Sequence, residues 1–133
     1  MTECWNIEPG AAVGPIRLGK KASDYIAILG PHYETFRRTP DDPREVLAFD
    51  PLSVHLTVDQ TQTVILVSVF RPRTVCLRGI QLLDCEVGTV ARELRLAGLG
   101  VEEVDAGLWC KDAGVVLVEV DGRIDGVEVG RLE

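Results

Sequence analysis

Apolar and polar residues alternate most regularly in the middle of the chain. The stretch from Val54 to Val58 places apolar side chains at every second position, as a strand with one buried face does. Polar residues 59–62 follow as a turn, and residues 64–70 form a second run rich in valine and isoleucine. This pattern predicts an antiparallel hairpin over residues 54–70.

Two stretches have helical spacing instead. Apolar residues at positions 22, 25, 26 and 29 predict a helix that ends at Gly30-Pro31. Residues 86–97 predict a second helix, with apolar residues at 87, 90, 91 and 94. Residues 34–45 are polar and contain two prolines, so they form the longest predicted loop. Further strands are predicted at 46–49, 108–110, 115–120 and 124–129, with Asp121-Gly122 as a hairpin turn.

The order of predicted elements repeats along the chain. Ile16 matches Ile80 at a spacing of 64 residues (80 − 16), and Val54 matches Val116 at a spacing of 62 (116 − 54). One such unit has too little sheet to cover its helix, whereas two units can share a core. We therefore expect an α+β fold in one domain, residues 1–133. Two tandem helix-plus-three-strand units, approximately 1–72 and 73–133, would share an antiparallel sheet with the helices packed on one face.

Composition narrows the classes of partner. The formal net charge is −7 and the sequence pI is about 4.8. Nucleic-acid binding depends on basic surfaces that displace counterions, so the charge argues against it. No polybasic membrane anchor is present. No stretch approaches the roughly 18 consecutive apolar residues that span a bilayer.

The four cysteines are Cys4, Cys76, Cys85 and Cys110, and no two of them form a C-x-x-C pair. Structural zinc sites commonly use such pairs, so no metal site is expected. No G-x-x-x-x-G-K-(S/T) motif for phosphate binding is present, and we expect no other cofactor. The N-terminal residues lack the basic start and apolar core of a signal peptide. We therefore expect a cytoplasmic protein with four free thiols.

Residues with catalytic potential are few. His32 and His55 are the two histidines, and neither has a serine, cysteine or acid beside it at motif spacing. Paired carboxylates and an aromatic residue are better candidates for contacts with a protein partner. The predicted partner-binding residues are Asp41, Asp42, Glu45, Glu102, Glu103, Asp105 and Trp109. We expect no enzymatic activity.

The segment from Gly14 to Gly19, followed by Tyr25-Ile26 and Leu29-Gly30-Pro31, resembles a pattern of small bacterial domains. It is similar to the helix-plus-three-strand unit of BamE-like lipoproteins and of β-lactamase-inhibitory-protein-like domains, the latter with two units in tandem. The match covers about 18 residues in the first half of the chain. It is degenerate in the second half, where Leu83-Asp84 stands at the position that corresponds to Gly19. We expect the lipoprotein signal and the disulfides of the secreted relatives to be missing. The resemblance implies a fold, and a fold does not fix a function. Similar units mostly present a sheet face to another protein, so the resemblance favours a binding role.

These observations lead to three hypotheses. The first is an immunity-type protein that neutralises a bacterial toxin by direct binding, the toxin being a basic protein such as a nuclease. The second is a structural or adaptor module without catalysis, or a homodimeric interaction domain. The third is a small hydrolase that uses a histidine. The sequence leaves open whether the protein is a monomer or a homodimer.

Overall fold

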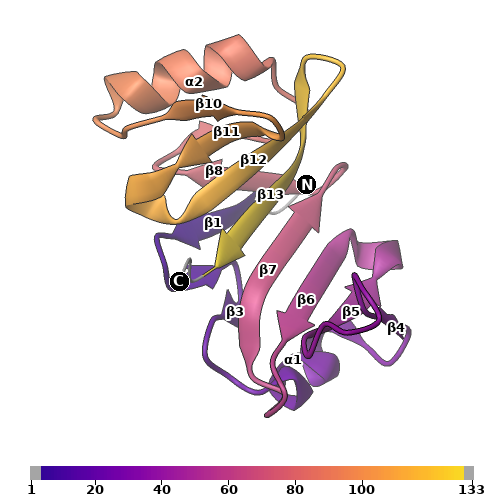
Figure 1. The fold of residues 1–133 in the computed structure, drawn as a ribbon. Helices are drawn as coiled ribbons and strands as arrows, with labels where there is room; N and C mark the ends of the chain where they lie inside the picture. The colour runs from indigo at the N-terminus through magenta and orange to yellow at the C-terminus, as the bar shows by residue number, and fades with distance from the viewer. Residues whose placement is uncertain (1–3, 131–133) are drawn as a thin grey trace.

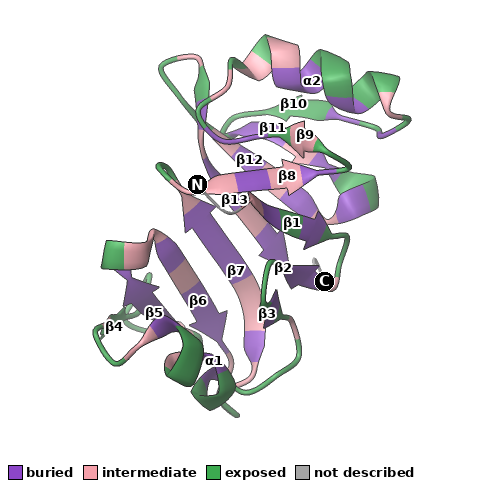
Figure 2. Ribbon diagram, turned by 180° about the vertical axis from the view of Figure 1, so that it is seen from behind, coloured by how far each residue is buried: buried purple, intermediate pink, exposed green. Residues whose placement is uncertain are grey.

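The structure is a computed structural model that describes residues 4–130. About 46% of these residues lie in strands and 19% in helices. The strands form two sheets, one of eight strands and one of five. Figures 1 and 2 show the smaller sheet packed against one face of the larger one, with the two helices at opposite ends of the molecule.

The large sheet is entirely antiparallel, in the order β10-β11-β12-β13-β7-β6-β5-β4. Four strands therefore lie on each side of the seam between β13 and β7. From the first half of the chain come β4 (Glu34–Phe36), β5 (Glu45–Phe49), β6 (Val54–Val58) and β7 (Val64–Phe70). From the second half come β10 (Glu102–Val104), β11 (Gly107–Cys110), β12 (Val115–Val120) and β13 (Arg123–Gly130).

The small sheet has the order β3-β2-β1-β8-β9, and its β1–β8 pair is parallel. Its strands are β1 (Cys4–Glu8), β2 (Ala12–Val13), β3 (Ile16–Arg17), β8 (Thr74–Leu77) and β9 (Ile80–Gln81). A disulfide between Cys4 and Cys76 joins β1 to β8, with Cα atoms 6.4 Å apart. The prediction of four free thiols is therefore wrong, because the β1–β8 pairing brings together two cysteines that are 72 residues apart.

The core lies between the two sheets. Because strand side chains alternate between faces, inward residues of all antiparallel neighbours fall into rows. One row crosses the large sheet through Phe49, Val54, Val69, Val127, Leu117 and Leu108, and every member is buried. Trp5, Ile7 and Leu77 of the small sheet belong to the same cluster.

The two helices are short, and each buries the apolar side chains on one of its faces. Helix α1 (Ala22–Leu29) buries Ala22, Tyr25 and Leu29, and the Tyr25 hydroxyl accepts a hydrogen bond of 2.8 Å from the Arg17 backbone N–H. Helix α2 (Val87–Leu96) buries Val90, Ala91 and Leu94. Two 3₁₀ turns, η1 (Asp50–Leu52) and η2 (Lys111–Ala113), precede β6 and β12. Among the described residues, neither helix has the length and hydrophobicity required to cross a membrane.

The predicted α+β fold is wrong. The chain is mostly β, and the core is closed mainly by a second sheet, where we expected helices on one face of a single sheet. Each half contributes four strands to the large sheet, one more than predicted. Residues 34–36 of the expected loop pair with β5, and residues 102–104 pair with β11. The repeat boundary near residue 72 stays a prediction.

Candidate binding face

The large sheet has one face that the small sheet does not cover, which we call the open face. A single row of side chains crosses it from edge to edge, one from each strand. In sheet order the row is Glu102, Trp109, Val116, Glu128, Ser68, His55, Ala48 and Glu34. Both ends of the row are exposed carboxylates, and its middle is half-buried or buried.

The part of the open face formed by β10, β11 and β12 is apolar and uncovered. Trp109, Val116 and Val118 are half-buried, whereas Val104 is 39% exposed and Val120 is 45% exposed. The connection from β10 to β11 is only residues 105–106, which is too short to fold back over these side chains. Apolar side chains that are gathered on an uncovered sheet face are typical of an interaction surface.

An aromatic group lies on the other half of the open face. The His55 ring centroid is 6.0 Å from that of Phe36 and 4.9 Å from that of Phe70, both in edge-to-face arrangement. Phe70 also lies over Gly126 of the neighbouring strand, where a Cβ atom would come within 2.9 Å of the phenyl ring. His55 Nε2 is 2.8 Å from Asp50 Oδ1, so η1 supplies an acidic partner to this histidine.

Beside this aromatic group, residues 37–44 cover part of the open face. Their contact across the sheet is the pair Arg38 Nη2–Glu128 Oε2, at 3.4 Å. Asp42 stabilises the conformation of this segment, because its carboxylate accepts two hydrogen bonds from the Arg44 side chain, at 3.0 and 3.1 Å. The hydrogen bonds from Arg44 hold the pKa of the Asp42 carboxyl below its ordinary value.

A small cavity of about 70 Å³ lies beneath this segment, lined in part by Arg38 and Thr57. The Thr57 hydroxyl is buried and has no hydrogen-bond partner within residues 4–130. A buried polar group without a partner destabilises the folded state, because it has lost its hydration.

We predict that Thr57→Val raises the free energy of unfolding by about 1 kcal/mol, since valine fills a similar space without the hydroxyl. Urea denaturation measures the change. Thr63→Val is the matched control and should lower stability, because the Thr63 hydroxyl is hydrogen bonded to that of Thr61 at 2.8 Å. Equal destabilisation by both substitutions would contradict the prediction.

The predicted partner-binding residues do not form one site. Asp41 and Asp42 lie in the segment 37–44 and Glu45 begins β5, at one side of the large sheet. Glu102 and Glu103 lie in β10 and Asp105 follows it, at the opposite edge. Trp109 lies on the open face next to Glu102 and Val116 in the row. Its indole Nε1 is buried without an acceptor among the described residues.

His55 lies on the open face without a nucleophile at its ring in the described residues. His55 is paired with Asp50, but in the described part of the chain no hydroxyl or thiol is hydrogen bonded to its ring. Ser68 neighbours His55 in the row, yet its hydroxyl donates to Glu128 at 3.4 Å and the residue is 1% exposed. A triad needs the nucleophile within hydrogen-bond reach of the base.

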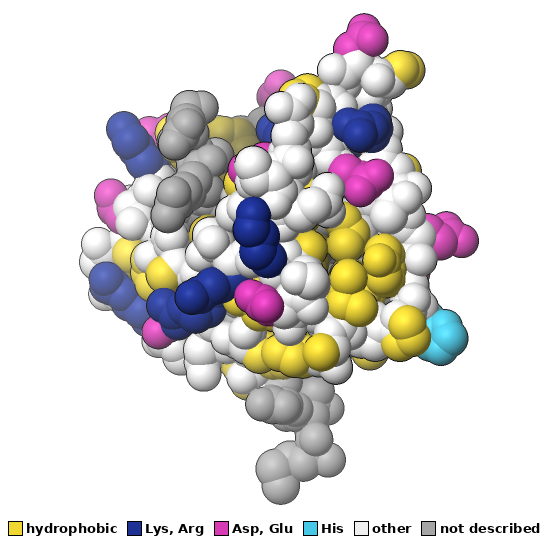
Figure 3. Space-filling view, turned by 90° about the horizontal axis from the view of Figure 1, so that it is seen from below, with side chains coloured by type: hydrophobic (Ala, Val, Ile, Leu, Met, Phe, Trp, Pro, Cys, Tyr) yellow, Lys and Arg dark blue, Asp and Glu magenta, His cyan; other side chains and the backbone are white. Residues whose placement is uncertain are grey.

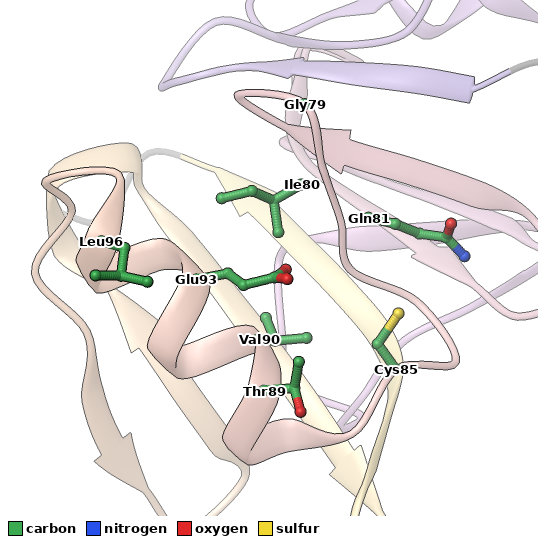
Figure 4. Close-up of a pocket in the computed structure, with 8 residues that line it drawn as sticks. All are labelled: Gly79, Ile80, Gln81, Cys85, Thr89, Val90, Glu93 and Leu96. Atoms are coloured by element: carbon green, nitrogen blue, oxygen red, sulfur yellow. The ribbon is translucent and has the colours of Figure 1, made fainter.

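A second hollow lies away from the open face, between α2 and β9. Its volume is about 610 Å³, and Ile80, Val90, Leu96 and the free thiol of Cys85 line it (Figure 4). Burial raises the pKa of the Cys85 thiol, and also that of Cys110. The reactive thiolate is therefore disfavoured at both cysteines.

Charged side chains of both signs are interspersed on the surface. Seen from the α1 end of the molecule, a hydrophobic area lies on the right, several basic groups gather on the left, and acidic groups are scattered over the surface (Figure 3). Arg17, Arg71 and Arg123 each pair with a carboxylate. Within residues 4–130 no group of three or more His, Cys, Asp and Glu side chains is placed to hold a metal ion.

Comparisons with protein-family models, curated proteins and solved structures found no match for this chain. The resemblance to BamE-like and β-lactamase-inhibitory-protein-like domains therefore stays a prediction.

Proposed function

We propose that this protein is an immunity-type inhibitor that binds and neutralises a toxin protein through the open face of its large sheet. The observation that carries the proposal is the uncovered apolar area around Trp109, Val116 and Val118. Buried tryptophan side chains are among the residues that contribute most to binding at protein interfaces. A half-buried tryptophan on a rigid strand loses little conformational entropy when a partner covers it.

Charge supports a basic partner. The protein carries a net charge of −7, and the row across the open face ends in Glu34 on one side and Glu102 on the other. Complementary charge accelerates association and suppresses wrong partners more than it adds affinity. A basic toxin such as a nuclease fits this distribution.

A homodimeric or adaptor role is the alternative. The edges of the large sheet argue against a homodimer formed by edge-to-edge strand pairing. The edge strands β4 and β10 have three residues each, and all six are exposed. Short edge strands with charged side chains oppose edge-to-edge pairing of sheets. Two copies joined along β10 would bring Glu102 and Glu103 of both chains together.

The disulfide bears on where this binding takes place. Disulfides form and persist in compartments that are not reducing, so the Cys4–Cys76 bond favours such a compartment over the cytoplasm expected from the sequence. We therefore propose that the inhibitor meets its toxin outside the reducing cytosol.

Co-expression with the toxin of a neighbouring gene, with both proteins directed to the oxidising periplasm, tests the proposal together with titration calorimetry on the purified pair without reductant. We expect protection of the cells, and we expect Trp109→Ala to weaken binding at least about tenfold. Leu96→Ala is the matched control, because Leu96 is 81% exposed but lies on α2, away from the open face. No protection, equal effects of both substitutions, or a stable homodimer that buries Trp109 would each refute the proposal.

A further inference from the structure

A pocket opens at the β4 edge of the large sheet, where the row across the open face ends. We call it the edge pocket, and its volume is about 360 Å³. It is lined by His32, Tyr33, Glu34, Ala48, Asp50 and Pro51. Glu34 and Ala48 belong to the row that also contains Trp109, so the edge pocket lies at the β4 edge of the same sheet face, six strands from Trp109.

The walls of the edge pocket are held in place by the core and by η1. The Tyr33 ring packs on the fully buried Phe49, with ring centroids 4.9 Å apart. Ala48 is 5% exposed and gives the pocket an apolar wall. Pro51 lies within η1 and has no rotatable side chain. The pocket is thus preformed, and binding in it does not require these residues to be ordered first.

The pocket combines this apolar wall with two carboxylates. Glu34 is exposed and has no ion-pair partner within residues 4–130. Asp50 has His55 as its partner, at 2.8 Å, and the Asp50 side chain is still 70% exposed. No lysine or arginine lines the pocket. The pocket therefore offers the unpaired carboxylate of Glu34 beside the exposed carboxylate of Asp50, whose ion-pair partner among the described residues is His55.

We propose that the edge pocket receives an arginine side chain of the partner protein. A guanidinium group matches this site in three ways: it binds carboxylates through two parallel hydrogen bonds, it stacks on an aromatic ring, and its methylene stem covers apolar surface. Glu34 and Asp50 supply the carboxylates, Tyr33 the ring, and Ala48 and Pro51 the apolar surface. Lysine fits less well, because its ammonium has neither the planar fork nor the stacking face.

The volume of about 360 Å³ leaves room for an arginine side chain and lies at the lower end of the roughly 300–1,000 Å³ of small-molecule pockets. The choice of a side chain therefore depends on the charge and the ring that line the pocket. Arginine is among the residues enriched as binding anchors, and these anchors fill preformed pockets. This inference rests on the proposed function, since it names the chemistry of the partner at the same face.

The first test needs no partner protein. Blocked arginine (N-acetyl-arginine amide) is titrated into the isotopically labelled protein, and amide chemical shifts are followed. With blocked arginine we expect saturable chemical-shift changes confined to residues 32–36 and 48–51. Blocked lysine should bind at least about fivefold more weakly. Blocked citrulline, which has the shape of arginine without the charge, should not bind. Equal responses to arginine and citrulline would overturn the inference.

Substitutions then assign the effect to the pocket. Glu34→Gln with Asp50→Asn should abolish the arginine response, whereas Asp24→Asn, which removes an exposed carboxylate from α1, should leave it unchanged. All three positions are exposed, and unchanged unfolding curves will establish that the variants fold. An arginine response that persists in the double variant would overturn the inference.

Measurements of toxin binding distinguish a failure of this inference from a failure of the proposed function. If Trp109→Ala weakens toxin binding and the Glu34→Gln, Asp50→Asn variant does not, the proposed function stands and the arginine pocket is refuted. If blocked arginine binds as expected but no toxin is bound, the pocket stands and the proposed function is refuted. If the double variant loses at least about tenfold in toxin affinity, both are supported.

Discussion

Alanine at position 107 is expected to lower the free energy of unfolding by about 3 kcal/mol or more. Gly107 lies in β11 with φ of +148°, a conformation that residues with a side chain rarely adopt. A Cβ atom there would overlap the carbonyl oxygen of Leu117 and lie 2.9 Å from the backbone nitrogen of Glu119. Both atoms belong to β12, so relief of the clash breaks the ladder between the two strands.

Gly88→Ala is the matched control and should act in the opposite direction. Gly88 lies within α2, and the nearest atom to an added Cβ is a Glu86 carboxylate oxygen at 3.6 Å. Gly88 is the second residue of α2, so alanine is favoured there by less than the roughly 0.5–1 kcal/mol of a helix interior. Denaturant titration of both variants measures the contrast. A loss below 1 kcal/mol at Gly107 would contradict the strand pairing described for β11 and β12.

Reduction of the disulfide is expected to cost about 4 kcal/mol of stability. The bond closes a loop with a sequence separation of 72 residues, and the loss of chain entropy in the unfolded state grows with loop length. Chemical unfolding with and without dithiothreitol measures the difference.

The variant with both Cys4→Ala and Cys76→Ala should show the lower stability without reductant and no further change with it. Cys85→Ala is the control that keeps the disulfide, and its stability should still fall when reductant is added. Equal stability of the unsubstituted protein with and without reductant would show that the bond does not form in solution.

Local patterns predicted most of the secondary structure. The helix at residues 22–29 is confirmed as α1, the stretch 86–97 contains α2 (Val87–Leu96), and the hairpin over 54–70 is confirmed as β6 and β7. These elements are visible in the sequence because their apolar spacing reflects one buried face. Tyr25, Val90 and Leu56 are buried as their spacing requires.

The arrangement of the strands could not be predicted in the same way. The repeat alignment pairs Val54 with Val116, but Val54 lies in the core and Val116 lies on the open face. An alignment that is shifted by one residue moves every side chain of a strand to the opposite face of the sheet. The pairing of β1 with β8 joins residues about 70 positions apart, and no local pattern encodes it. The small sheet and its disulfide follow from that pairing.

The candidate site was predicted only in part. Trp109 is a predicted binding residue, and the structure places it on the open face, where its binding role stays a prediction. The Asp50–His55 pair was missed, because Asp50 approaches His55 only through η1, whose cap Ser53 has a φ of +59°. The edge pocket combines residues from β4, β5 and η1, so its chemistry becomes visible only when the register of the sheet is known.

The position of β13 at the centre of the large sheet has a consequence for biosynthesis. This strand is the last in sequence among those described, yet it pairs with both β12 and β7. During translation, the valine-rich strand β7 therefore presents an unpaired edge until Gly130 has left the ribosome. We expect the nascent chain to engage chaperones over that interval, and we expect nonsense mutations before Arg123 to yield aggregating fragments with no partly active domain.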